Sequence, residues 1–359
     1  MKSIYKTVLL FLLIPLIASA HVDDKKHEKS RIIKKEFTVS TDAKLNIKNS
    51  YGNLNITTWD KKRVEIEVTI IVKGDDIDSV KEKLERIDVE FESSLNFVSA
   101  ITKFEKGKNR WSLWKKNNNL NFQINYIIKM PKTNDADLDN DYGSIFLSDL
   151  SGTANINCDY GKISIGELSA ENNSINLDYC SASNVVFMKS GNLDLDYSKI
   201  TIENSGTLKV NADYSALKFE KIEDIDFNAD YGSITIDEAL NVNGKSDYVS
   251  MRFGTIRKNL KIDTDYGAIF VKRLVKDFES VNIDGEYAGI RINVDQDAVF
   301  NFELNLQYAS FKRNDDNIEF YKKISKSSKK YYEGKFGKGN SDSSIKINSQ
   351  YGGVSIKEN

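Results

Sequence analysis

The chain has 359 residues, 29% of them charged, and its formal net charge at pH 7 is −2. This balance argues against nucleic acid as a partner, because nucleic-acid-binding domains carry a marked excess of basic residues on one face. The only two histidines, His21 and His27, lie near the N-terminus, so a Ser-His-Asp or Cys-His hydrolase would have no histidine in the body of the fold to act as its base.

Residues 1–20 have the three parts of a secretory signal peptide. Lys2 and Lys6 precede an apolar run, and small residues at 18–20 form a cleavage site. The apolar run of about ten residues is much shorter than the roughly 20 needed to span a bilayer, which favours a cleaved signal over an uncleaved anchor. We therefore predict an exported protein, either periplasmic, associated with the outer surface or secreted, with no transmembrane segment once the signal is removed.

A flexible N-terminal tail is predicted at residues 21–31, followed by an N-terminal β-rich cap at residues 32–130. The cap begins with the stretch Ile32–Val72, in which apolar and polar residues alternate as they do in strands.

Further along the cap, apolar residues at helical spacing predict one short helix near residues 75–87. Residues 89–104 and 120–130 are interpreted as further strands of the cap. A Lys/Asn-rich loop between them contains Trp111 and Trp114.

A tyrosine frame recurs through residues 131–359: a polar residue, tyrosine, a small residue and then alternating apolar residues. Its eleven tyrosines are Tyr142, Tyr160, Tyr179, Tyr197, Tyr214, Tyr231, Tyr248, Tyr266, Tyr287, Tyr308 and Tyr351, and Tyr51 in the cap is an isolated twelfth copy. Successive members are 17–21 residues apart, except that Tyr351 follows after 43. A repeat near 18 residues suits one coil of a β-solenoid, in which each turn stacks on the previous one.

Each repeat contains two strands with opposite burial phase. With the tyrosine as position 0, apolar residues occupy −6 and −4 before it, as in Leu208 and Val210, and +3 and +5 after it, as in Leu217 and Phe219. A further apolar residue often falls at +8. Since a shift of one residue moves every side chain to the other face, the chain must bend at the tyrosine, and the small residue at +1, such as Gly143, suits a tight corner.

Lysine-rich sequence interrupts the repeat near residues 313–344, which we interpret as an insertion or as a degenerate coil before a closing repeat at Tyr351. The predicted fold class is all-β: a single-stranded β-helix-like solenoid of about eleven coils of 17–21 residues, with an N-terminal β-rich cap that contains one short helix.

The eleven tyrosines are predicted to form a structural corner ladder. Aromatic neighbours in such a ladder contribute about 0.5–1.5 kcal/mol beyond burial. The alternative is an exposed aromatic strip that binds sugar rings or another flat polymer.

A row of aspartates precedes the tyrosines by one residue and is expected to face the opposite way. The row consists of Asp141, Asp159, Asp178, Asp196, Asp213, Asp230, Asp247 and Asp265. These carboxylates could bind Ca²⁺ or another ligand, since hard cations take several oxygen ligands. The favoured interpretation is a corner or solvated row, in which aspartate accepts backbone hydrogen bonds.

The two cysteines, Cys158 and Cys180, are expected to remain unpaired in this exported chain. Cys158 lies two residues before its tyrosine and Cys180 one residue after its own, so in regular strands they would point to opposite faces.

No P-loop, dinucleotide-binding fingerprint or zinc spacing is present, and we predict no catalytic residue, no metal ligand and no cofactor. Acidic residues are plentiful, however, so a polysaccharide lyase or hydrolase that uses carboxylates on the flank of the solenoid stays open as an alternative. The lysine-rich segments could bind an anionic polymer or simply be solvated loops.

The opening NSYGNLNITTWDKKRVEIEV, the mid-chain DLDNDYGSIFLSDLSG and the many DYG-x-I-x-I segments resemble the adhesin-like domain family of bacterial envelope proteins. This is a domain of unknown function, similar to auto-transporter adhesin heads, and the resemblance covers residues 32–358. It implies a β-helix-like solenoid and an exported location, and it supplies no catalytic residues. The chain departs from the motif where Cys180, Ser198, Ser215 and Val249 replace the glycine.

We therefore expect a non-enzymatic, adhesin-like protein of the cell envelope or cell surface, with the solenoid as a binding or structural surface. Its partner would be a glycan, an envelope component or another surface protein.

Overall fold

The computed structural model describes residues 26–105, 119–313 and 317–359. Within these ranges the fold is all-β, with one 24-stranded sheet and a single helix, α1 (Ile77–Glu85). In this part of the chain no helix is long and apolar enough to cross a membrane. The expected signal peptide, with His21, and the two tryptophans of the Lys/Asn-rich loop lie outside the described residues.

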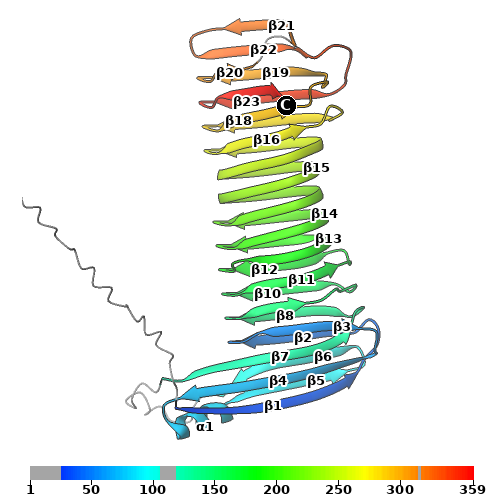
Figure 1. Cartoon of the computed structure of the whole chain (residues 1–359), viewed down its shortest axis with the longest axis vertical. Coiled ribbons are helices and arrows are strands. Elements are labelled where there is room, and N and C mark those ends of the chain that lie inside the picture. The colour runs from blue at the N-terminus through cyan, green and yellow to red at the C-terminus, as the bar shows by residue number, and fades with distance from the viewer. Residues whose placement is uncertain (1–25, 106–118, 314–316) are drawn as a thin grey trace, which may run out of the picture.

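Most strands lie side by side along one long axis (Figure 1). In chain order, the strands of this stack that precede the C-terminal end are β8 (Asp135–Asp141), β9 (Ser144–Leu147), β10 (Ala154–Asp159), β11 (Lys162–Leu168), β12 (Asn173–Asp178), β13 (Ser183–Asp196), β14 (Lys199–Asp213), β15 (Ala216–Asp265), β16 (Ala268–Leu274), β17 (Ser280–Glu286), β18 (Gly289–Val294), β19 (Phe300–Gln307) and β20 (Phe311–Lys312). Val210 of β14 lies opposite Leu193 of β13 and opposite Phe227 of β15, in parallel pairs 17 residues apart. The sequence repeat is therefore the unit that stacks.

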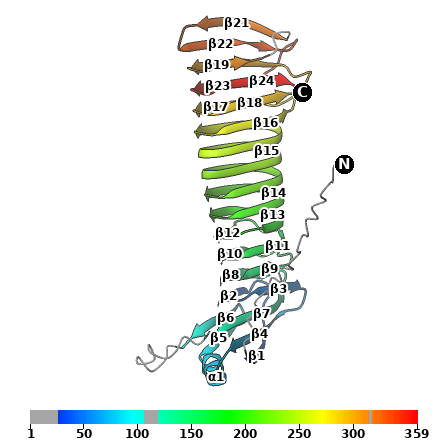
Figure 2. The same cartoon turned by 60° about the vertical axis from the view of Figure 1, so that its left-hand side comes forward.

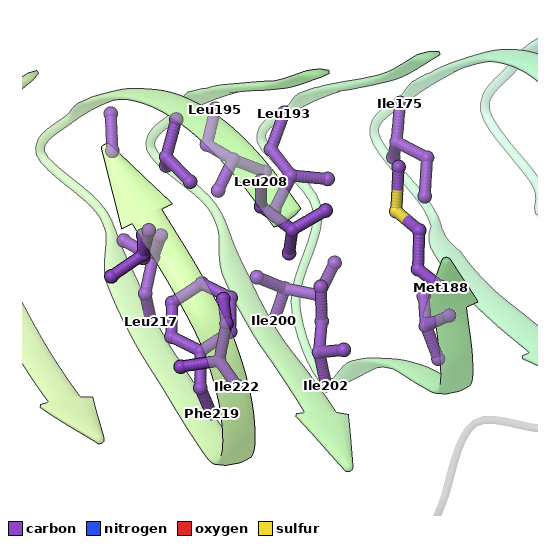
Figure 3. Close-up of a cluster of buried hydrophobic side chains, with 14 of the residues drawn as sticks. Ile175, Met188, Leu193, Leu195, Ile200, Ile202, Leu208, Leu217, Phe219 and Ile222 are labelled. Atoms are coloured by element: carbon purple, nitrogen blue, oxygen red, sulfur yellow. The ribbon is translucent and has the colours of Figure 1, made fainter. Parts of the chain in front are cut away.

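The apolar interior follows the predicted phase. Leu208 and Val210 are buried before Tyr214, and Leu217 and Phe219 are buried after it. Figure 3 shows Leu208, Leu217 and Phe219 pointing into the space between the two strands of their repeats. The predicted apolar residues at +8 are buried as well: Leu150, Leu168, Ile222, Ile256 and Leu274. Alternate residues thus form one continuous core along the stack.

The bend between the two strands lies at the tyrosine itself. All twelve tyrosines of the frame have a left-handed backbone, with φ between 49° and 66°. This conformation costs roughly 1–2 kcal/mol for a residue with a side chain. Inter-repeat hydrogen bonds fix the corner: the backbone N–H of Tyr142, for example, donates to the carbonyl of Asp159 in the next repeat at 2.8 Å.

The small residue at +1 fits this corner, as expected, but it does not supply the unusual backbone, since Gly143 does not have a positive φ. Gly143 is needed for close approach: a Cβ there would lie 1.8 Å from the carbonyl oxygen of Gly52 in the neighbouring repeat. Where serine replaces the glycine, as at Ser198 and Ser215, the side chain is buried and its hydroxyl donates to a backbone carbonyl. The corner thus keeps one backbone conformation and accepts either a glycine or a buried serine at +1.

The N-terminal region widens one end of the stack (Figures 1 and 2). Its strands are β1 (His27–Thr38), β2 (Lys44–Ser50), β3 (Leu54–Trp59), β4 (Arg63–Gly74), β5 (Ile87–Ser94), β6 (Phe97–Phe104) and β7 (Asn121–Pro131). Antiparallel pairs β1–β4, β4–β7 and β5–β6 form most of it, while β2 and β3 pair in parallel with β8 and β9. The Tyr51 repeat is thus the first layer of the stack.

Two predictions for this region are refined by the structure. The short helix is present as α1, and the side chain of Asp76 caps it by accepting a hydrogen bond from the backbone N–H of Ser79 at 2.9 Å. The predicted flexible tail is wrong for residues 27–31, because they form the start of β1 and pair with β4, with His27 opposite Gly74.

The order of the repeats changes at the C-terminal end. The last repeat in sequence consists of β23 (Ser344–Gln350) and β24 (Val354–Glu358). β23 pairs with both β17 and β19, and β24 with both β18 and β20, so the Tyr351 repeat lies between those of Tyr287 and Tyr308. The expectation that Tyr351 closes the stack was therefore wrong.

An antiparallel hairpin, β21 (Ile318–Ser325) and β22 (Lys329–Phe336), occupies the segment where an insertion or a degenerate coil was expected. β22 pairs antiparallel with β19, which places the hairpin at the end of the stack (Figure 1). The 43-residue step to Tyr351 is thus an excursion into the hairpin followed by a return.

Candidate functional site

The tyrosine row is a continuous stack of twelve aromatic rings. From one end to the other it consists of Tyr51, Tyr142, Tyr160, Tyr179, Tyr197, Tyr214, Tyr231, Tyr248, Tyr266, Tyr287, Tyr351 and Tyr308. Neighbouring ring centroids are 4.7–5.1 Å apart and neighbouring rings are 0–7° from parallel. The spacing is that of neighbouring strands, about 4.8 Å.

The rings remain at the surface, with 42–59% of each residue exposed. Because each ring face is covered by the next ring, the row presents ring edges and hydroxyl groups to solvent. At one end, Phe122 also packs against Tyr51, with centroids 4.9 Å apart. A sugar ring that stacks on an aromatic face would find these faces occupied, so the geometry disfavours the sugar-strip alternative along most of the row. The structural role of the ladder stays a prediction.

The aspartates of the row are exposed or half-buried next to the exposed tyrosines, so the two rows share the outer surface and the expectation of opposite faces was wrong. Partial desolvation first, and then neighbouring carboxylates, raise the pKa of Asp159, Asp178, Asp213 and Asp247. The neighbouring carboxylates also contribute, after desolvation and the adjacent rings, to a raised pKa of Tyr160. The two rows therefore form one acidic, aromatic edge.

No chelating group arises from the aspartate row: among the described residues, no three His, Cys, Asp or Glu side chains are arranged to hold a metal ion. The nearest neighbours of the row are asparagine and aspartate ladders that the sequence analysis did not single out. Asn155 donates to Asp137 at 3.0 Å and Asn157 donates to Asp139 at 3.1 Å, each across one repeat. In these ladders the asparagine side chains occupy carboxylate lone pairs with hydrogen bonds, so the ladders supply no ligand set for Ca²⁺.

The cysteines are unpaired, as expected, but the stated reason was wrong. Both thiols are buried. The left-handed residue Tyr179 turns Cys180 inward, and the Sγ of Cys180 donates to the carbonyl oxygen of Cys158 at 3.0 Å. Contact with Cys180, together with burial, raises the pKa of the Cys158 thiol. A buried thiol of this kind is a weak nucleophile.

An acidic groove with one basic wall lies at the C-terminal end. It has a volume of about 600 Å³. Its carboxylates come from the strands that precede the tyrosines and its amines from the hairpin β21–β22. The charged residues are Asp263, Asp265, Asp284, Glu286, Lys326, Lys329 and Lys330. A carboxylate-based polysaccharide enzyme needs two carboxyl groups close together, and this groove gathers four carboxylates beside its lysines.

A second recess, of about 430 Å³, lies on the strands that follow the tyrosines in the same repeats. Arg252, Phe270, Arg291 and Lys312 line it, together with small and aliphatic residues. The sequence analysis did not single these residues out. They could have been found in the sequence, because Arg252, Phe270 and Arg291 each lie four residues after a tyrosine of the frame and fall in one row when the repeats are aligned.

Comparisons with known proteins add little to this geometry. No protein-family model and no curated protein matches the chain. Among solved structures, a candidate lipid-binding protein from Parabacteroides distasonis is 13% identical, with 72% of this chain and 95% of that chain covered and a TM-score of 0.34.

Two further structures bear adhesion-related names. A candidate adhesin from Bacteroides fragilis is 13% identical, with 92% of this chain and 97% of that chain covered and a TM-score of 0.26. A candidate cell adhesion protein from Clostridium sporogenes is 11% identical, with 92% and 100% covered and a TM-score of 0.18. At these TM-scores the likenesses carry no conclusion about this chain.

Proposed function

We propose that this chain is a non-enzymatic, adhesin-like protein of the cell envelope or cell surface that uses its stacked repeats as a stiff binding surface. The observation that carries the proposal is the evenness of the tyrosine ladder, in which every step is 4.7–5.1 Å. A catalytic centre needs different groups that converge on one point. A surface that repeats one pattern from end to end suits multiple weak contacts with an extended partner.

The stack is proposed to be a single-stranded β-solenoid. In support, equivalent residues of successive repeats pair in parallel and in register, as Asp196 does with Asp213 and Asp213 with Asp230. Pairing on both sides leaves free strand edges only at the two ends. The N-terminal strands and the hairpin β21–β22 lie at those ends and cover the edges of the stacked repeats.

Export is proposed from the sequence of residues 1–20, which has the parts of a signal peptide. A stiff stack anchored or held at one end would present its other end away from the cell. The acidic, aromatic edge and the two C-terminal recesses would then be open to partners.

The competing function is a polysaccharide lyase or hydrolase. The acidic groove favours it specifically, because Asp284 and Glu286 lie across from Lys326 and Lys329 in one recess. Paired carboxylates next to cationic groups could serve general acid–base chemistry on an acidic sugar polymer.

The two functions are separated by one pair of measurements on the purified protein. Labelled protein is applied to an array of neutral and acidic glycans, and the same protein is incubated with acidic polysaccharides while new chain ends are quantified. We expect retention on the array without new chain ends.

Asp284→Asn is the informative variant for the turnover assay, and Asp139→Asn, at the same position relative to its tyrosine but outside the groove, is its matched control. Product that forms with the parent and with Asp139→Asn, but not with Asp284→Asn, would replace the proposed function by the enzymatic one.

A further inference from the structure

The recess on the strands that follow the tyrosines is a trough that runs along the stack. Its wall is a row of residues at position +4, in which Arg252 lies opposite Phe270 and Phe270 opposite Arg291. The row continues through Ser355 to Lys312. Neighbouring members are one strand spacing apart, about 4.8 Å, so the two arginines are separated by roughly 9.6 Å.

The arginines of the trough are held by an aromatic ring instead of a carboxylate. The guanidinium carbons of Arg252 and Arg291 lie 5.2 and 5.9 Å from the centroid of the Phe270 ring. A guanidinium stacked in this way keeps its N–H groups free in its own plane, where they can bind a carboxylate with two hydrogen bonds.

Other arginines of the stack already have acidic partners. Arg257 lies 2.8 Å from Glu238 and Arg273 lies 2.9 Å from Asp295. Within the described ranges, neither Arg252 nor Arg291 has an ion pair, and no acidic residue is among those that line the trough. The trough is thus a concentrated positive site on a chain whose net charge is −2.

The floor of the trough is left bare although the fold would tolerate side chains there. A Cβ added at Gly289 would have no heavy atom within 4 Å, and one at Gly353 would only reach the hydroxyl of Ser310 at 3.5 Å. Neither glycine has a positive φ. Gly289 is the first residue of β18, and one meaning of a glycine within a strand is a place that a ligand or another backbone approaches closely.

We propose that this trough binds an acidic polysaccharide of uronic-acid type, laid along the stack, with Arg252 and Arg291 each binding a carboxylate of the polymer. The proposal rests on the proposed function as a surface-binding protein and names its ligand class and its site. Charge complementarity selects the acidic polymer, and the bare floor accommodates the sugar rings. The acidic face of the same repeats would repel the denser charge of a nucleic acid.

The test is calorimetric titration of the purified protein with oligogalacturonate, with its methyl-esterified, uncharged counterpart and with single-stranded DNA. We expect binding of oligogalacturonate that weakens as salt is raised, and weaker binding of the other two. Equal binding of the uncharged counterpart, or tighter binding of the DNA, would overturn the ligand class.

The site is tested by filling its floor. Gly289→Leu should weaken oligogalacturonate binding at least about tenfold while the melting temperature is unchanged, because the new side chain occupies the trough and meets no protein atom. Ala216→Leu, at the same position two residues after its own tyrosine but outside the trough, is the matched control and should bind like the parent.

The double variant Arg252→Gln/Arg291→Gln tests the same site without adding bulk and should also lose at least about tenfold in affinity. If neither Gly289→Leu nor the double variant changes the affinity, the site assignment is wrong while the binding function stands. If the parent binds no glycan of any kind on the array, the proposed function itself fails.

Discussion

The two strands on either side of the tyrosine row have the same core and opposite surfaces. In the C-terminal repeats, the strands before the tyrosines carry outward acids such as Asp263 and Asp284, whereas the strands after them carry outward cations such as Arg252 and Arg291. Both kinds of strand place apolar residues inward at alternate positions, such as Leu260 and Ile262 before a tyrosine and Met251 and Phe253 after one. Inward positions therefore specify the fold, and outward positions are free to differ in charge from one face to the other.

The comparison extends to glycine. At the corner, glycines such as Gly143 and Gly352 lie against a backbone carbonyl of the neighbouring repeat, so the fold needs them. On the cationic face, Gly289 has open space. Glycine is thus required for packing at the corner, whereas on the cationic face it leaves open space that the fold does not need. This difference is the reason for assigning the trough to binding.

The largest effect is expected when a charge is introduced at an inward position, which tests the distinction between inward and outward positions directly. Ile234→Asp should destabilise the protein by more than about 4 kcal/mol or unfold it, since Ile234 is 1% exposed and an unpaired carboxylate would be buried. Denaturant unfolding followed by circular dichroism measures the loss. Thr235→Asp, at the neighbouring outward position, is the control and should stay within about 1 kcal/mol of the parent. Equal effects of the two substitutions would show that the burial phase is misassigned.

The two roles of glycine are compared by making the same substitution twice. Gly143→Ala should cost about 1–3 kcal/mol, because the new Cβ overlaps the carbonyl oxygen of Gly52 and the backbone must shift. Gly289→Ala should be neutral within about 0.5 kcal/mol. Thermal unfolding of both variants measures the difference. A neutral Gly143→Ala would mean that the repeats are not packed this closely in solution.

The burial phase, the position of the corner and α1 were all predictable from local pattern. Alternating apolar residues such as Leu208 and Val210 specify a strand face, and the shift of phase at the tyrosine requires a bend. The left-handed conformation of the tyrosines was not predictable, because glycine stands next to each of several of them and ordinarily takes that backbone. Here the glycine packs against the neighbouring repeat, and the tyrosine before it adopts the left-handed φ.

The spatial order of the last repeats could not be predicted from the local sequence pattern either. Nothing in the sequence around Tyr351 states that its strands pair with β17 and β19, since that choice depends on contacts distant in sequence. The exchanged order places Ser355 between Arg291 and Lys312, which the order of the sequence would have made direct neighbours. Arg252, Phe270 and Arg291, by contrast, lie in three successive repeats, and their row could be found by aligning outward positions as carefully as inward ones.

The tyrosine row lies between the acidic and the cationic face. Its contribution to stability can be divided into that of the stacked rings and that of the left-handed backbone. Tyr231→Ala removes two stacking contacts, with Tyr214 and Tyr248, each at 4.9 Å, and should cost about 1–3 kcal/mol. Tyr231→Gly removes the same contacts but suits the left-handed backbone, so it should be about 1 kcal/mol more stable than the alanine variant. Denaturant unfolding of both variants decides. An alanine variant that is the more stable of the two would contradict a left-handed corner.

The smallest effect expected is the pH dependence of the acidic face. The pKa values of Asp159 and Asp178 are raised above the ordinary value of 3.8, by desolvation first and then by neighbouring carboxylates. The native state therefore holds protons that the unfolded chain has released. The stabilising effect of protonation is present in full below pH 3.8 and is lost as the pH rises through the folded-state pKa values.

Removing these two charges should consequently stabilise the protein at neutral pH. Asp159→Asn/Asp178→Asn should raise the melting temperature at pH 7 by roughly 1–2 °C, and the gain should shrink as the pH approaches 3, where the parent carboxylates are protonated in both states. Asp277→Asn, an exposed aspartate outside the row, is the control and should show no such gain. A gain that is equal at both pH values would assign the effect to the new amide groups, because repulsion within a row of carboxylates must disappear once they are protonated.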